Sequence, residues 1–317
     1  MHDQPEMSDP DSIATAIRGN EIVGLDIFTQ TKDALEDFPA TRVQELMSSM
    51  NNDIPTGGQD YSYGDEDTQR LRFWKARSPC APVIIFVHGG SWQIGTYLDS
   101  IGSAKVTYLL DQGYAFASVN FSLVPSVTVE EQVQEVAHTI AYLTKKATEL
   151  GIDPQNLVLM GHSSGAHVVA LLGTDASYLS KAGVKISSIR GVIAVDGSNY
   201  NAIADFMDSP GPVANNLAFA LGREPSRLRA MSPTYHARGA NAGAFLLLHA
   251  QRDGGIRQAV EFAAVLEASG TDVALHVFEG RSFEGHMQML LRLRETDFPA
   301  TAVMDEWLRR YVPVSLK

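Results

Sequence analysis

Apolar and polar positions along this chain follow two alternating patterns, which predict buried strands separated by helices. Residues 82–87 form a continuous run of proline, valine, isoleucine and phenylalanine, typical of a strand covered on both faces. Residues 129–150 instead repeat apolar positions every three to four residues and precede Gly151, which predicts a long amphipathic helix. Because such strands and helices take turns from residue 69 onward, we predict an α/β fold with a mostly parallel central sheet and helices on both faces.

The same patterns assign the remaining elements. Strands are predicted at 69–76, 114–120, 157–160, 189–196, 245–249 and 273–278, and helices at 99–112, 164–172, 256–268, 287–294 and 303–311. Two segments break the alternation. Residues 1–60 are polar and irregular apart from helix-like stretches at 21–32 and 40–50, and residues 197–230 are interrupted by prolines and asparagines. We therefore expect an N-terminal segment over 1–60 and one α/β domain over 61–317 that contains an irregular insert at 197–230.

Composition excludes several classes of protein. The chain has 317 residues, 44% of them hydrophobic and 20% charged, which excludes whole-chain disorder, collagen and coiled coil. No apolar run approaches the ~18 residues that a membrane-spanning helix needs, so no membrane span is expected. The acidic, polar start lacks the features of a signal peptide, and we expect a cytoplasmic location. The net charge of -12 argues against nucleic-acid binding, which needs a basic face.

Cysteine content narrows the chemistry further. Cys80 is the single cysteine, so neither a disulfide within the chain nor a zinc site built on cysteines can form. No base-bearing motif surrounds Cys80, and we do not expect it to act as a nucleophile. Nothing in the sequence implies a metal or an organic cofactor.

The first chemical motif follows the predicted strand at 157–160. Its sequence is Gly161-His162-Ser163-Ser164-Gly165, a G-x-S-x-G motif between a strand and a helix. A sharp turn at Ser163 needs very small residues two positions away on either side, and it lifts the serine Oγ above the sheet. The N-terminus of the following helix favours negative charge there. An ordinary Ser-Gly turn would fit the motif alone, but the strand and helix around it favour a nucleophile at Ser163.

A second motif follows the predicted strand at 82–87. Its sequence is His88-Gly89-Gly90-Ser91-Trp92. Two successive glycines allow backbone N–H groups to point into a site, as the stabilisation of a tetrahedral oxyanion requires. We predict that Gly89 and Gly90 form an oxyanion hole together with the N–H of Ser164. His88 is expected to brace this loop by hydrogen bonds.

Candidate acid and base residues follow later strands. Asp253 comes after the predicted strand at 245–249, and His286 follows the strand at 273–278 on what we predict to be a loop. The chain order Ser163, Asp253, His286 is that of one class of hydrolase. Asp196 also ends a strand and is the main competitor for the acid. We favour Asp253, because the strand before the histidine usually supplies the acid in this topology.

With these motifs, the chain resembles proteins of the α/β-hydrolase fold, specifically those of the esterase and lipase branch. His88-Gly89-Gly90-Ser91-Trp92 is similar to the H-G-G-x-W motif of kynurenine formamidase (arylformamidase)-like hydrolases, whereas hormone-sensitive-lipase-like esterases have glycine where this chain has Ser91. Tyr63-Gly64, Gly161 to His167 and Ser232-Pro233 agree with the same family. The resemblance covers roughly residues 60–295. It implies that residues 1–60 and the insert at 197–230 form the lid and the substrate pocket.

The resulting functional hypothesis is a serine hydrolase that cleaves carboxylic esters through an acyl-enzyme, with a small-molecule ester or amide as substrate. An arylformamidase acting on N-formylkynurenine-like amides is the first alternative, and a non-catalytic ligand-binding protein of the same fold is the second. The candidates for shaping the pocket, all of which also fit core packing or a loop role, are Ser91, Trp92, Asn199, Tyr200 and Phe206. The residues leave acyl-chain length and oligomeric state open, with a homodimer as one alternative.

Overall fold

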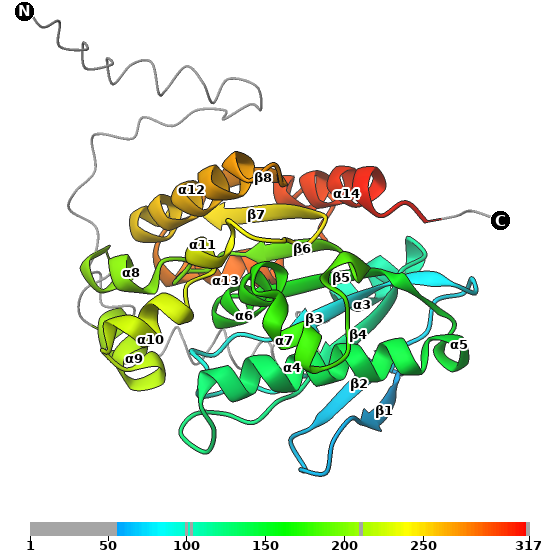
Figure 1. Ribbon diagram of the computed structural model, residues 1–317. Helices are drawn as coiled ribbons and strands as arrows, with labels where there is room; N and C mark the ends of the chain where they lie inside the picture. The colour runs from blue at the N-terminus through cyan, green and yellow to red at the C-terminus, as the bar shows by residue number, and fades with distance from the viewer. Residues whose placement is uncertain (1–55, 99–100, 102–103, 209–211, 315–317) are drawn as a thin grey trace, which may run out of the picture. The chain divides into compact units, whose positions relative to one another are not determined.

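A computed structural model describes residues 56–98, 101, 104–208 and 212–314 (Figure 1). The helix-like stretches predicted at 21–32 and 40–50, and most of the N-terminal segment, lie outside these residues. Within the described part of the chain, no helix is both long and apolar enough to span a bilayer.

Eight strands form one sheet in the order β1-β2-β4-β3-β5-β6-β7-β8. Their bounds are β1 Gln59–Ser62, β2 Arg70–Trp74, β3 Ala81–Val87, β4 Ala115–Val119, β5 Ile152–His162, β6 Ile189–Val195, β7 Ala244–Ala250 and β8 Asp272–Phe278. The pairs β1–β2 and β2–β4 are antiparallel, and all pairs from β4 to β8 are parallel. The predicted mostly parallel sheet is therefore confirmed, and the short strand β1 is an addition that the sequence pattern did not reveal.

Helices cover both faces of this sheet, as predicted. The principal helices are α3 Ala104–Asp111, α4 Val129–Lys145, α6 Ser164–Thr174, α12 Asp253–Ala268, α13 Ser282–Leu291 and α14 Pro299–Tyr311. Apolar residues of α4, α6 and α12 belong to one core, and those of α3, α13 and α14 belong to a second. Successive strand residues alternate between the two, with Ile85 in the first core and Ile84 in the second. This alternation explains why β3 is buried along its whole length and appears in the sequence as an unbroken apolar run.

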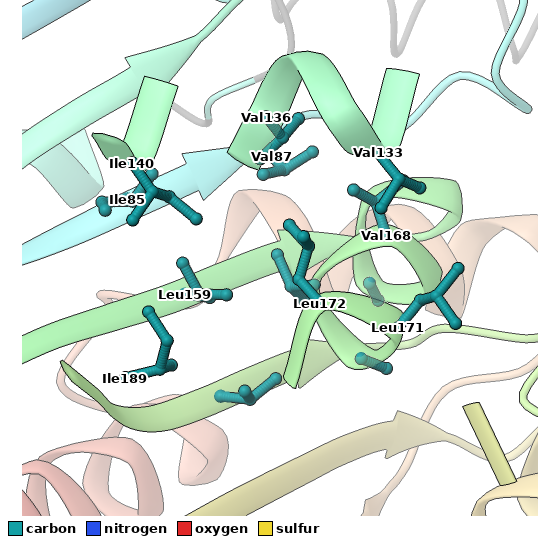
Figure 2. Packing of buried hydrophobic residues seen from close by; sticks show 14 of the residues in the cluster. Ile85, Val87, Val133, Val136, Ile140, Leu159, Val168, Leu171, Leu172 and Ile189 are labelled. Carbon is teal, nitrogen blue, oxygen red and sulfur yellow. The ribbon is translucent and has the colours of Figure 1, made fainter. Parts of the chain in front are cut away.

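Figure 2 shows part of the first core from close by. Its labelled residues are Ile85 and Val87 of β3, Leu159 of β5, Ile189 of β6, Val133, Val136 and Ile140 of α4, and Val168, Leu171 and Leu172 of α6. All of them are almost fully buried. Truncating any one leucine or isoleucine of such a core to alanine typically costs about 2–5 kcal/mol. The ends of β3 and β5, and the start of α6, are thereby held in fixed positions.

The segment at 197–230 is helical rather than irregular, so this expectation was wrong. It contains α8 Ala202–Asp208, α9 Pro212–Leu221 and α10 Pro225–Ala230, and α11 Pro233–His236 follows. Pro225 and Pro233 occupy the first turns of α10 and α11, where the missing N–H has no intrahelical partner to lose. These prolines therefore start helices instead of interrupting them. Helices α8, α9 and α10 pack together on the side of the sheet where β7 ends (Figure 1).

Three smaller differences from the prediction concern the helices. The long predicted helix at 129–150 divides at Lys146 into α4 and α5 Ala147–Leu150. A short helix, α7 Ala176–Lys181, follows α6. Helices α12 and α13 each begin earlier than predicted, at Asp253 and Ser282. The last difference matters for the site, because it places both the predicted acid and the predicted base within helices.

Candidate active site

Ser163 occupies a strained turn between β5 and α6. Strand β5 ends at His162 and α6 begins at Ser164, so Ser163 alone makes the turn, with φ 57° and ψ -124°. A positive φ in a residue other than glycine costs on the order of 1–3 kcal/mol and persists only where the surroundings enforce it. From Leu157 to Thr174 every residue is buried except Ser163. The fold thus brings one hydroxyl out of an otherwise buried segment.

The two glycines of the motif make this turn possible. A Cβ on Gly161 would lie 2.2 Å from the carbonyl oxygen of Gly165, and a Cβ on Gly165 would lie 2.2 Å from that of Val87. Real Cβ atoms do not approach backbone so closely, so no other residue fits at either position. The N–H of Ser163 donates to the carbonyl oxygen of Val195 at 3.0 Å, which fixes the turn to the end of β6.

The loop after β3 lies directly against Ser163. A Cβ on Gly89 would lie 2.9 Å from the Ser163 Cβ. Gly90, Ser91 and Trp92 all have positive φ, at 115°, 52° and 62°. In the described part of the chain, no protein acceptor takes the N–H groups of Gly89, Gly90 or Ser164. These three N–H groups therefore have no acceptor within the described residues, and their role as an oxyanion hole stays a prediction.

Side chains hold this loop in place. His88 Nδ1 lies 2.7 Å from the carbonyl oxygen of Gly89, and its ring stacks on Phe121 with ring centroids 4.4 Å apart. The backbone N–H of Trp92 donates to Ser164 Oγ at 3.3 Å, and its carbonyl accepts from Gln132 Nε2 at 2.8 Å. The loop is thus braced from the sides of β4, α4 and α6, and His88 takes the bracing role expected of it.

His286 is paired with Asp196, and the preference for Asp253 was wrong. His286 Nδ1 donates to Asp196 Oδ2 at 2.5 Å. Asp253 is the first residue of α12 and is exposed. The chain leaves β7 and turns into α12 so early that Arg252, not Asp253, lies against the Asp196 carboxylate. The acid therefore follows β6 rather than β7. His286 itself lies in α13, not on the predicted loop.

Asp196 is fully buried, and its carboxylate has four neighbours. Oδ1 accepts the backbone N–H of Ala250 at 3.0 Å and lies 3.2 Å from His249 Nδ1. Oδ2 accepts from His286 and lies 2.8 Å from Arg252 Nε. Burial acts to raise the pKa of Asp196, but the charge of Arg252, the close His249 ring and the hydrogen bond of His286 outweigh it, so the pKa lies well below its usual value. The carboxylate is consequently ionised at neutral pH.

The His286 imidazole is held in its neutral form. Burial first, and then the charge of Arg252, lower its pKa, while the hydrogen bond to Asp196 acts in the opposite direction. Because Nδ1 carries the proton donated to Asp196, the lone pair of the neutral ring is at Nε2. His162 packs on this ring with centroids 4.4 Å apart, and its Nε2 donates to the His286 carbonyl at 3.0 Å. Burial first, and then the repulsion between the two rings when both are protonated, hold the pKa of His162 well below its usual value.

Of the predicted pocket residues, some lie in the loops near Ser163 and Asp196, and others pack in the core or in α8. Ser91 and Trp92 belong to the loop beside Ser163, and Asn199 follows Asp196 with a positive φ of 62°. Tyr200 has no exposed surface and stacks on Phe262, so it packs the core and the pocket assignment was wrong for it. Phe206 is half-buried in α8 beneath the guanidinium of Arg223.

Three residues of the site escaped the sequence analysis. His249 lies near the end of β7, Arg252 follows that strand, and His162 lies inside the G-x-S-x-G motif. His249 falls in an apolar run, where a histidine is most simply a packed residue. The available signal was a cluster of polar residues, His249 to Asp253, at a strand's carboxyl end, where ligands bind in open α/β sheets.

Comparison with known proteins adds independent findings. The model of the BD-FAE family matches residues 73–266, more than half of the chain. A probable isoprenylcysteine α-carbonyl methylesterase of Oryza sativa subsp. japonica is 26% identical over 69% of this chain and 56% of its own length. A kynurenine formamidase of Danio rerio is 24% identical over 77% of this chain and 80% of its own. The chain thus spans little more than half of the plant protein.

Solved structures show the same fold. A thermophilic esterase of Thermogutta terrifontis, Est2, superimposes with a TM-score of 0.66 at 21% identity, over 83% of this chain and 95% of the esterase chain. The predicted resemblance to the α/β-hydrolase fold, with esterases and kynurenine formamidase among its members, is confirmed by these matches.

Proposed function

The chain belongs to the BD-FAE family, and from that membership together with the site we propose that it hydrolyses carboxylic esters through a serine nucleophile. The observation that supports this most is the surrounding of Ser163. Its hydroxyl emerges from a buried turn, beside three backbone N–H groups that no acceptor in the described residues takes. It lies at the sheet end where a neutral imidazole is paired with an ionised carboxylate. Acyl transfer needs this set of groups.

In the proposed reaction, Ser163 Oγ attacks the ester carbonyl and His286 Nε2 takes its proton. The N–H groups of Gly89, Gly90 and Ser164 stabilise the oxyanion, and the loss of one such donor typically costs about 3–4 kcal/mol of barrier. His286 then gives the proton to the leaving alcohol. In the second half of the reaction, His286 takes a proton from water as the water attacks the acyl-enzyme. It then returns this proton to Ser163 Oγ, and the acid is released.

Asp196 acts through His286 in this scheme. Its carboxylate holds the proton at Nδ1, which leaves Nε2 as the base nitrogen, and it stabilises the imidazolium that forms. This proposal replaces Asp253 by Asp196 and keeps Ser163 and His286 in their predicted roles.

Hydrolysis of an N-formyl amide is the second candidate. The kynurenine formamidase match extends over most of both chains, further than the match to the plant methylesterase. The chemistry at Ser163 is the same for both substrates, because each passes through a tetrahedral oxyanion. The two candidates differ in the leaving group and in the size of the acyl pocket, since a formyl group needs almost no room.

A panel of three substrates separates these candidates. We would compare kcat/KM for p-nitrophenyl acetate, p-nitrophenyl octanoate and N-formylkynurenine, with Ser163→Ala as the control. The proposal predicts turnover of at least one ester and its loss by several orders of magnitude in Ser163→Ala. A preference for N-formylkynurenine would establish the second candidate instead. Ester turnover that survives in Ser163→Ala would contradict both.

A further inference from the structure

Arg252 is the one permanently charged group among the four neighbours of the Asp196 carboxylate described above. Its Nε lies 2.8 Å from Asp196 Oδ2, and its Nη2 donates to the Asp196 backbone carbonyl at 3.1 Å. The other neighbours are the N–H of Ala250 and the rings of His249 and His286. The N–H of Ala250 and the His286 ring make hydrogen bonds to the carboxylate, whereas Arg252 Nε and His249 Nδ1 lie at ion-pair distance without hydrogen-bond geometry.

An ionised carboxylate with no exposed surface needs a compensating charge. His286 cannot supply it in the resting enzyme, because a general base must be neutral before it takes a proton. A guanidinium keeps its charge over the whole working pH range and binds oxygen through several fixed N–H groups. Arg252 is suited to this task, and its side chain is about 29% exposed, so the pair touches solvent on one side.

We propose that Arg252 is a positioning residue of this site, which fixes the Asp196 carboxylate against His286 and keeps the imidazole in its base form. This inference rests on the proposed function only where activity is the readout. The proposal also gives the connection between β7 and α12 a role. Because Asp196 at the end of β6 supplies the carboxylate, this connection supplies the positive charge of Arg252 instead.

The charged and titratable groups around His286 all bear on this assignment. Asp196 faces it from the end of β6, Arg252 and His249 from the β7 side, and His162 from β5. Lys105 of α3 lies further off and acts on His162. Arg252 disfavours the imidazolium while Asp196 favours it. Removing the guanidinium therefore raises the pKa of His286, and the enzyme loses its base form at a higher pH.

The test compares Arg252→Met, Arg252→Gln and Arg252→Lys with the wild type. A matched control is Arg257→Met on the same helix, which removes a guanidinium paired with Asp208 at 2.5 Å. Two readouts are followed: the acid limb of the pH profile of kcat/KM, and the titration of the His286 ring by NMR in the resting enzyme. The second readout requires no turnover.

We expect both midpoints to move up by about one pH unit in Arg252→Met and Arg252→Gln. At pH values below the midpoint, this shift lowers kcat/KM about tenfold. That loss comes in addition to any change in the pH-independent value of kcat/KM. Arg252→Lys should recover most of the shift, and Arg257→Met should leave both midpoints unchanged.

Unchanged midpoints in Arg252→Met and Arg252→Gln would overturn the inference, whatever happens to the plateau rate. A uniform loss at all pH values, with Arg252→Gln close to wild type, would assign Arg252 a packing role only. If the protein cleaves no substrate, the NMR titration still decides the inference, so its failure is distinct from that of the proposed function.

Discussion

Asp196 Oδ2 and His286 Nδ1 lie 2.5 Å apart although 90 residues separate them in the chain. Parallel strands explain the meeting. Asp196 directly follows β6, and α13 returns from β8 with His286 at the same end of the sheet. Asp196 has a positive φ of 45°, and its N–H donates to the carbonyl oxygen of Leu248 in the neighbouring strand. The position of the carboxylate is thus set by the backbone of two strands.

This pairing predicts which carboxylate the activity needs. Asp196→Asn should lower kcat about ten-thousand-fold, because the amide supplies the wrong partner for the Nδ1 proton. Asp253→Asn is the matched control and should stay within a few-fold of wild type, since Asp253 is exposed at the start of α12. Steady-state kinetics on the best ester of the panel check both. The opposite ranking would restore Asp253 as the acid.

The buried Lys105 predicts a pH dependence of stability. Its Nζ donates to the carbonyl oxygens of Leu290 and Ile101 and lies 5.6 Å from the centre of the Phe86 ring. Burial lowers the pKa of Lys105 to about 7, whereas its ordinary value, kept in the unfolded chain, is 10.5. Between these values the unfolded state binds more protons, so the free energy of unfolding rises with pH, by at most about 1.4 kcal/mol per unit.

Urea unfolding at pH 7 and pH 9 measures this effect. Lys105→Met should remove the rise, and the exposed Lys181→Met should keep it. Equal pH slopes in Lys105→Met and wild type would show that the buried amine does not titrate in this window.

The glycines of the nucleophile turn predict a steric effect on stability. Gly165→Ala would bring a Cβ within 2.2 Å of the Val87 carbonyl oxygen and 2.5 Å of that of His88. Both are backbone atoms that cannot move aside, so we expect a loss of about 3 kcal/mol or more in the free energy of unfolding. Gly239→Ala is the control, because its new Cβ would meet its nearest neighbour at 3.4 Å. Thermal denaturation compares the two, and equal effects would contradict the close packing of backbone at this turn.

Local patterns made part of this site predictable from sequence. Gly161, Ser163 and Gly165 are close in the chain, and the steric demand of one sharp turn selects them directly. The same holds for Gly89 and Gly90, where loop geometry depends on neighbouring residues. Strand positions were predictable for a similar reason, since burial on both faces leaves an unbroken apolar run.

The acid was not predictable in this way. The choice between Asp196 and Asp253 depends on where α12 begins, and a helix boundary is uncertain by a few residues in any sequence pattern. A start at Asp253 places Arg252 next to the carboxylate and leaves Asp253 exposed. The helices of 197–230 were missed because Pro225 suggests a break, although the first turn of a helix accepts proline.

Covalent labelling tests the central claim, that Ser163 is an activated nucleophile, most directly. The protein would be treated with a fluorophosphonate, digested, and the modified peptide mapped by mass spectrometry, with Ser163→Ala and His286→Ala treated in parallel. We predict one adduct on Ser163, no adduct in Ser163→Ala, and labelling slowed by orders of magnitude in His286→Ala, where the base is missing. An unlabelled wild-type protein, or an adduct that persists on another residue in Ser163→Ala, would contradict the account.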